Sequence, residues 1–192
     1  MKLTKEWLER KRACESGIEW FNRLGKTELL DVGLAAIDDN LVGYAKWLIR
    51  NVCSNNKKLS VEVAIFAAEK VLHIFEKKYP RDKRPRNAIE AAKGWLNNPS
   101  EENRLAADEA ASAAVSAAWD ADAATWAAVR AAEAAAASAR AASSSDGTWA
   151  AHTTSFAWFV TAEAAAKQKT QKQIFRYLCK RVAVYEGKEV AE

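Results

Sequence analysis

The sequence predicts an all-α protein, a compact bundle of about seven to nine helices, several of them long and rich in alanine. Only seven glycines and three prolines occur in 192 residues, so turns are few and the elements are long. Apolar residues recur three and four positions apart along most of the chain, which is the spacing of one helical face. From residue 101 to 142 alanine dominates, and alanine is the best helix former.

The first 56 residues predict a region of short helices. The first apolar pattern forms one helix or, if Gly17 interrupts it, two short helices. Gly25 is the expected C-terminal end of this helical segment. A short amphipathic helix is expected over residues 27–40. The next one places four apolar side chains on one face, namely Leu41, Tyr44, Leu48 and Val52.

The middle of the chain predicts two stronger helices. Ser60 is the expected N-cap of the first, whose buried stripe is Val61, Ile65, Ala68, Leu72 and Phe75. The second follows Pro85, a residue favoured at the first helical position. It is expected to bury Ile89, Ala92 and Leu96, with Trp95 at the edge of the buried face.

The alanine-rich block, residues 101–142, is one long helix or two helices divided at Asp120–Asp122, where either aspartate can cap the second. Its sparse bulky residues, Val115, Trp119, Trp126 and Val129, are expected to pack between helices, and an exposed aromatic stripe is the alternative. After a break at "SSSDGT", Asp146 or Thr148 is expected to cap the next helix. Thr170 and Gln173 match a capping box for the last.

These elements predict three parts of the chain. Residues 1–56 form the short-helix region, residues 57–185 form the alanine-rich bundle, and residues 186–192 form a frayed tail. The three cysteines are few and far apart, which indicates reduced thiols and a cytoplasmic protein. No apolar run is long enough to predict a membrane span or a secretory signal.

The residue pattern gives little support for catalysis, a cofactor or a metal. Glu69, His73 and Glu76 share one helical face, but two histidines and no paired cysteines argue against a metal site. No nucleophile motif and no glycine-rich phosphate loop occurs. An enzyme is therefore the third hypothesis for the function.

Charge is segregated along the chain. Residues 77–93 carry seven Lys/Arg against two acids, and residues 167–181 carry six Lys/Arg and no acid, whereas residues 101–166 carry nine acids against three arginines. The two basic clusters could bind nucleic acid. The acidic block argues against this function, because it would repel the phosphate backbone. The contacts expected in the second cluster, for nucleic acid or an acidic partner, are Lys167, Lys169, Lys172 and Arg176.

The stretch "YPRDKRPRNAIEAAKGW" at residues 79–95 resembles a segment of the immunity proteins of bacterial toxin–immunity loci. In that family a similar proline- and arginine-rich segment precedes alanine-rich helices that carry aromatic residues, and the resemblance covers about residues 60–180. The first 55 residues have a weaker likeness, to short segments of phage-encoded proteins. The resemblance implies a small helical protein that neutralises a protein partner by stoichiometric contact: a toxin, or a host defence protein as in anti-CRISPR activity.

The expected partner-binding residues are Arg81, Asp82, Arg84 and Arg86, because the planar guanidinium pairs with carboxylates and stacks on aromatic rings. A structural interpretation competes with this one. In it, Arg84 and Arg86 pair with acids of the alanine-rich block, such as Asp108 or Asp120. The oligomeric state stays open, and exposed alanine–tryptophan faces would allow a dimer.

Overall fold

The fold was analysed in a computed structural model that describes residues 1–142, 148–164 and 167–187, with the side chains of 123–124, 148, 162–164 and 167 excepted. These residues form ten α-helices. The first four are short: α1 (Lys5–Arg10), α2 (Glu15–Leu24), α3 (Leu29–Asp38) and α4 (Val42–Cys53). The other six are longer: α5 (Lys57–Lys78), α6 (Arg84–Asn97), α7 (Glu101–Asp120), α8 (Ala123–Ala142), α9 (Thr148–Ala164) and α10 (Lys167–Tyr185).

The all-α prediction is confirmed, and the number of helices exceeds the seven to nine expected because the N-terminal region divides into four. In the described part of the chain, the only β-type pairing is one isolated bridge, between Lys2 and Glu28. The same residues contain no helix that is long and apolar enough to cross a membrane. The predicted domain division at residue 56 stays a prediction, and most of the predicted tail lies outside the described residues.

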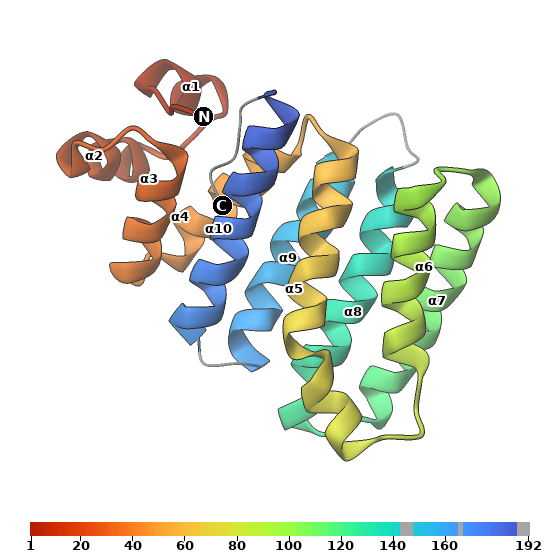
Figure 1. Ribbon diagram of the computed structural model, residues 1–192. Helices are drawn as coiled ribbons and strands as arrows, with labels where there is room; N and C mark the ends of the chain where they lie inside the picture. The colour runs from red at the N-terminus through yellow and green to blue at the C-terminus, as the bar shows by residue number, and fades with distance from the viewer. Residues whose placement is uncertain (143–147, 165–166, 188–192) are drawn as a thin grey trace.

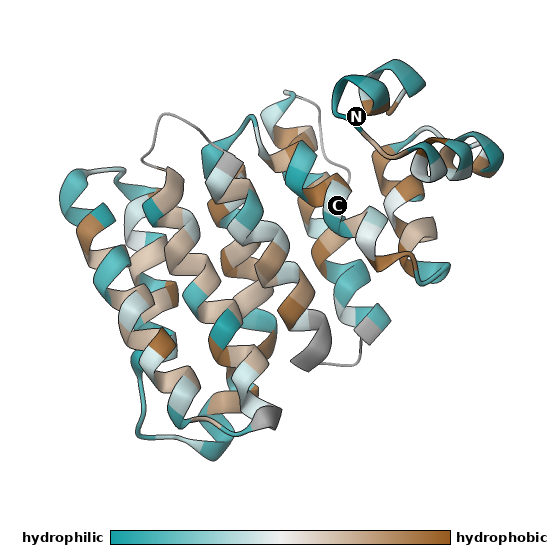
Figure 2. Ribbon diagram, turned by 180° about the vertical axis from the view of Figure 1, so that it is seen from behind, coloured by the Kyte–Doolittle hydropathy of each residue, from teal (hydrophilic) through white to brown (hydrophobic). Residues whose placement is uncertain are grey.

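The six long helices lie side by side with roughly parallel axes, and the short helices α1 to α3 sit beyond α10 (Figure 1). Helix α8 is central: it packs against α5, α6, α7 and α9. The N-terminal helices attach through contacts of α3 with α10 and of α4 with α9. Hydropathy follows this arrangement, because the long helices are mostly apolar in colour while the turns at their ends are hydrophilic (Figure 2).

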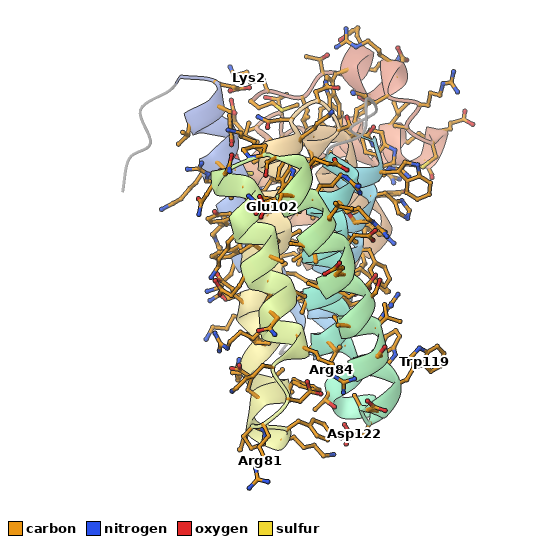
Figure 3. All side chains as sticks on the ribbon, turned by 90° about the vertical axis from the view of Figure 1, so that its right-hand side faces the viewer. Lys2, Arg81, Arg84, Glu102, Trp119 and Asp122 are labelled. Carbon is orange, nitrogen blue, oxygen red and sulfur yellow. The ribbon has the colours of Figure 1, made fainter. Side chains whose placement is uncertain are left out.

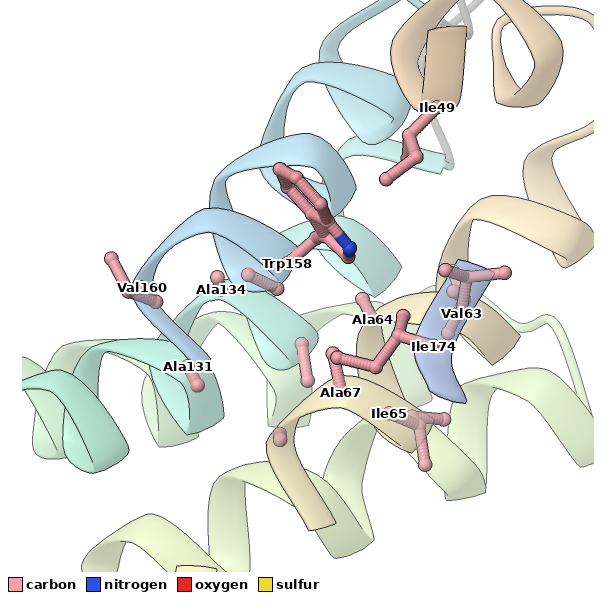
Figure 4. Close-up of a cluster of buried hydrophobic side chains, with 14 of the residues drawn as sticks. Ile49, Val63, Ala64, Ile65, Ala67, Ala131, Ala134, Trp158, Val160 and Ile174 are labelled. Atoms are coloured by element: carbon pink, nitrogen blue, oxygen red, sulfur yellow. The ribbon is translucent and has the colours of Figure 1, made fainter. Parts of the chain in front are cut away.

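Alanine makes the close packing of α8 feasible. Its buried residues are nearly all small, and Ala128, Ala131, Ala132 and Ala135 are completely inaccessible to solvent. Because helix separation depends on the side chains at the contact, small residues on every side let four neighbours surround one helix. A few large residues fill the remaining volume, notably Trp158, whose indole N–H donates to the Gln171 carbonyl at 3.4 Å (Figure 4).

Buried hydroxyl groups connect the helices through hydrogen bonds to backbone carbonyls. Thr154 donates to the Ser60 carbonyl at 2.8 Å, and Thr161 donates to the Ala67 carbonyl at 3.3 Å. Each of these bonds joins α9 to α5. Small hydroxyl side chains therefore occupy the same narrow spaces as alanine and satisfy backbone carbonyls as well.

Several predicted helix ends are corrected by the structure. Helix α5 begins at Lys57 with Asn56 as its N-cap, and Ser60 lies buried inside the helix, where its hydroxyl donates to the Cys53 carbonyl at 3.1 Å. Helix α10 begins at Lys167, so the capping box at Thr170 and Gln173 is wrong. The caps expected at Asp146 and Thr148 lie outside the described residues and side chains.

The alanine-rich block is two helices. Asp122 is the cap of the second, since its carboxylate accepts from the backbone N–H of Thr125 at 3.1 Å. Trp95, expected at the edge, is buried, and Leu96, expected inside, is half-buried. The packing predicted for two tryptophans is also wrong: Trp119 is 85% exposed and Trp126 is 44% exposed.

Gly33 lies where α3 packs directly against α10. A Cβ atom at this position would overlap the ring of Phe175, which is fully buried on α10. Gly33→Ala is therefore expected to destabilise the fold by about 1–3 kcal/mol, despite alanine's better helix propensity. The free energy of unfolding from chemical denaturation measures this effect.

The matched control is Gly43→Ala, since a Cβ there would meet nothing within 4 Å. Its free energy of unfolding is expected to stay within about 0.5 kcal/mol of the wild type. Equal effects of the two substitutions would contradict a steric role for Gly33.

Candidate protein-binding surface

The loop between α5 and α6 is ordered by its own sequence. Helix α5 ends at Lys78, ahead of Tyr79 and Pro80, because the residue before a proline avoids helical geometry. The backbone N–H of Asp82 donates to the Tyr79 carbonyl at 3.1 Å and closes the turn. Pro85 then occupies the first turn of α6, where a missing N–H costs nothing.

Arg84 joins this loop to the end of α7. Its guanidinium forms a two-pronged contact with Asp82, with Nε donating to Oδ1 at 3.0 Å and Nη2 donating to Oδ2 at 2.7 Å. The same Nη2 donates to Asp120 Oδ2 at 2.8 Å. Hydrogen bonds from Arg84 lower the pKa of Asp82 and, in return, the two carboxylates raise the pKa of Arg84.

Further ion pairs fix the same end of the bundle. Arg86 makes a two-pronged contact with Glu76 of α5, both bonds being 2.6 Å long. Lys78 of α5 pairs with Asp122 in the α7–α8 turn, and its hydrogen bond is the main cause that lowers the pKa of Asp122 to about 2. The α5–α6 loop and the α7–α8 turn are thus held together by charge-assisted contacts.

The arginine-rich loop is therefore largely engaged inside the molecule. Arg84 pairs with Asp120, as the structural interpretation expected, whereas Asp108 pairs with Arg140 at 2.9 Å. Arg81 differs, because it is exposed and has no partner among the described residues. The prediction that these residues also contact a partner stays a prediction.

Two exposed tryptophans flank the α7–α8 turn. Trp119, the penultimate residue of α7, projects away from the bundle at the end that carries Arg81, Arg84 and Asp122 (Figure 3). We call Arg81, Arg84, Trp119, Asp120 and Trp126 the loop-end surface. Both tryptophans lie beside the helix break between α7 and α8, which the sequence located, but their spacing did not predict their exposure.

Trp126 belongs to an aromatic–cation cluster. The guanidinium carbon of Arg130 lies 5.7 Å from the ring centre of Trp126 and 5.4 Å from that of Phe156, so it sits between α8 and α9. Arg130 also pairs with Glu133 at 3.0 Å, and burial raises the pKa of that carboxyl. The buried Nε of Arg130 has no hydrogen-bond acceptor in the described structure.

The second basic cluster forms an exposed stripe on α10. Lys169, Arg176 and Lys180 are exposed along one side of the helix. Lys172 is instead half-buried and pairs with Asp38 of α3, and the side chain of Lys167 lies outside those described. Arg181 is also engaged, through a two-pronged contact with Glu62 of α5 at 2.6 and 2.8 Å.

The acids considered for a metal site are used in ion pairs. Glu69 pairs with Lys93 at 2.9 Å, and Glu76 pairs with Arg86. Among the described residues, no group of three or more His, Cys, Asp or Glu side chains is placed to hold a metal ion.

Comparison with known proteins identifies the family. The model of the family described as "Imm-5 like putative immunity protein" matches residues 51–179, about two thirds of the chain. The chain belongs to this family. The match begins near the end of α4 and covers α5–α9, most of α10 and the whole loop-end surface. No curated protein and no solved structure matches the chain.

The pairing of Arg84 with Asp82 is expected to make stability depend on pH. Because the pKa of Asp82 is lowered in the folded state, its contribution is present above its ordinary value of 3.8 and is lost as pH falls through the lower folded value. Asp82→Asn should reduce the free energy of unfolding by about 1 kcal/mol at pH 7, since both groups are partly solvated. The difference from the wild type should shrink below about pH 4.

Urea unfolding at several pH values measures this difference, and Glu109→Gln on the exposed face of α7 is the matched control. A difference between wild type and Asp82→Asn that stays constant from pH 7 to pH 3 would show that the carboxylate charge is unimportant.

Proposed function

We propose that this protein neutralises a protein partner by stoichiometric contact, without catalysis, and that the loop-end surface makes the contact. Membership of the immunity family supports a protein partner as the class of ligand. The ion pairs within the molecule support the location, because they hold the α5–α6 loop and the α7–α8 turn together before a partner arrives.

The observation that carries the proposal is Trp119. A tryptophan that is 85% exposed contributes little buried apolar area to the stability of the fold. Tryptophan and arginine are, however, among the residues most enriched in binding hot spots. Arg81 and the Asp82–Arg84–Asp120 contact lie at the same end (Figure 3). A surface fixed in advance also loses little conformational entropy on binding.

Membership of the immunity family favours one partner in particular, a toxin whose gene lies at the same locus as the gene of this protein. A host defence protein, as in phage-borne anti-CRISPR activity, is the second candidate, because the first 50 residues lie outside the family match. Both candidates place the contact in the cytoplasm, and a one-to-one complex of monomers is the simplest arrangement.

Trp119→Ala is expected to weaken partner binding about thirtyfold or more while leaving the free energy of unfolding within about 0.5 kcal/mol of the wild type. The product of the neighbouring gene, purified and titrated calorimetrically, gives the affinity and stoichiometry. Growth of cells that express both genes tests neutralisation.

The matched control is Trp149→Ala, which removes a tryptophan that is 66% exposed at the start of α9, the opposite end of the bundle. Its affinity should equal that of the wild type. Equal loss of binding in both variants, or in neither, would remove the loop-end surface from the proposal.

Nucleic-acid binding is the second candidate function, and the exposed stripe of α10 is what favours it. If the stripe binds nucleic acid, the affinity of the protein for a 20-base-pair duplex should fall steeply as the salt concentration rises. Changing Lys169, Arg176 and Lys180 to glutamate should then reduce the slope of log affinity against log salt by about 2–3. Fluorescence anisotropy measures this slope, and no binding at about 50 mM salt would eliminate the candidate.

A further inference from the structure

The N-terminal helices enclose an apolar pocket of about 280 Å³. Its wall comes from α1 to α4 and from the α1–α2 connection. The lining residues are Leu8, Ala13, Cys14, Gly17, Trp20, Phe21, Val32, Gly43, Tyr44, Trp47 and Leu48. None of them carries a formal charge, so the interior offers carbon surface almost throughout.

The aromatic walls are fixed by contacts at the rim. The indole N–H of Trp20 donates to Asp39 Oδ2 at 3.0 Å, and the Tyr44 hydroxyl donates to Ser16 Oγ at 3.1 Å. The ring centres of Trp20 and Tyr44 lie 5.6 Å apart. The polar ends of both rings are thus used at the rim, which leaves their carbon atoms to face the hollow.

Trp47, another lining residue of α4, is ordered in the same way. Trp47 stands edge-on to Trp7, with ring centres 5.7 Å apart and planes 87° apart. An edge-to-face pair of this kind is a preferred aromatic geometry. The shape of the pocket is therefore set before any ligand enters.

The absence of a side chain at Gly43 keeps the hollow open. A Cβ atom at this position would meet nothing within 4 Å. Larger residues would fill space that the fold leaves empty. Protein interiors are normally packed to the density of organic crystals, and an unfilled apolar hollow lowers stability.

We propose that this pocket binds a small uncharged molecule built on a planar aromatic ring system of about two fused rings. A charged ligand would be buried there without a partner, which is strongly unfavourable. The volume exceeds that of the roughly 150 Å³ apolar cavities that accept benzene, and it approaches the lower limit of ordinary ligand pockets.

This binding is separate from the proposed neutralisation of a protein partner. All the lining residues lie between positions 8 and 48, whereas the family match begins at residue 51. The pocket is also at the far side of the molecule from Trp119 and Arg81 (Figures 1 and 3). Either activity can therefore fail without the other.

Indole is the probe for the test, with the full chain labelled for NMR. One indole per chain should bind saturably and shift the side-chain indole signals of Trp20 and Trp47, while that of Trp149 stays unchanged. The charged analogue indole-2-carboxylate should bind at least about tenfold more weakly.

Gly43→Leu, which places a side chain in the hollow, should abolish indole binding. Gly43→Ala keeps most of the volume and serves as the matched control. Thermal unfolding of both variants checks that the fold is intact. Saturable binding to Gly43→Leu, equal affinity for the charged analogue, or no shift of Trp20 and Trp47 in the wild type would each overturn the proposal.

Discussion

The close approach of α8 to its neighbours is the constraint on which the rest of the structure depends. Contact with four helices leaves α8 almost no outer surface, so small side chains are required nearly all round it. Helices that approach so closely leave little room for charged side chains between them, and the partly buried Arg130–Glu133 pair of α8 is an exception. Most of the other arginines and acids are placed at the helix ends and outer faces, where they pair in solvent-accessible positions.

This placement explains how a bundle with an alanine core acquires a defined binding surface. Two turns far apart in the sequence meet at one end, and Arg84 and Lys78 connect them through Asp120 and Asp122. Exposed ion pairs contribute little to overall stability, but several of them together hold the turns in one arrangement. Trp119 is then presented on a fixed support and not on a flexible loop.

Local physics made much of the fold predictable from the sequence. The periodicity of apolar residues located the helices. The expectation that Asp120 or Asp122 caps the second helix was correct, because an aspartate before a helix accepts a hydrogen bond from a backbone N–H of its first turn. The exposure of Trp119 was not predictable, because spacing shows which residues share a face and not whether another helix covers it. For the same reason, the pairing of Arg84 with Asp120 could be named only as one of two interpretations, since it joins positions 36 apart.

The contact of Gly33 with Phe175 has a consequence for how the chain can be divided. Residues 51–179 match the family, yet the ring of Phe175 inside that segment is covered by α3, which precedes it. Excising the family segment would uncover the large aromatic side chain of Phe175 on α10. Such a fragment would carry a sticky apolar patch prone to self-association, so the N-terminal helices act as a permanent cover for the bundle as well as an addition to it.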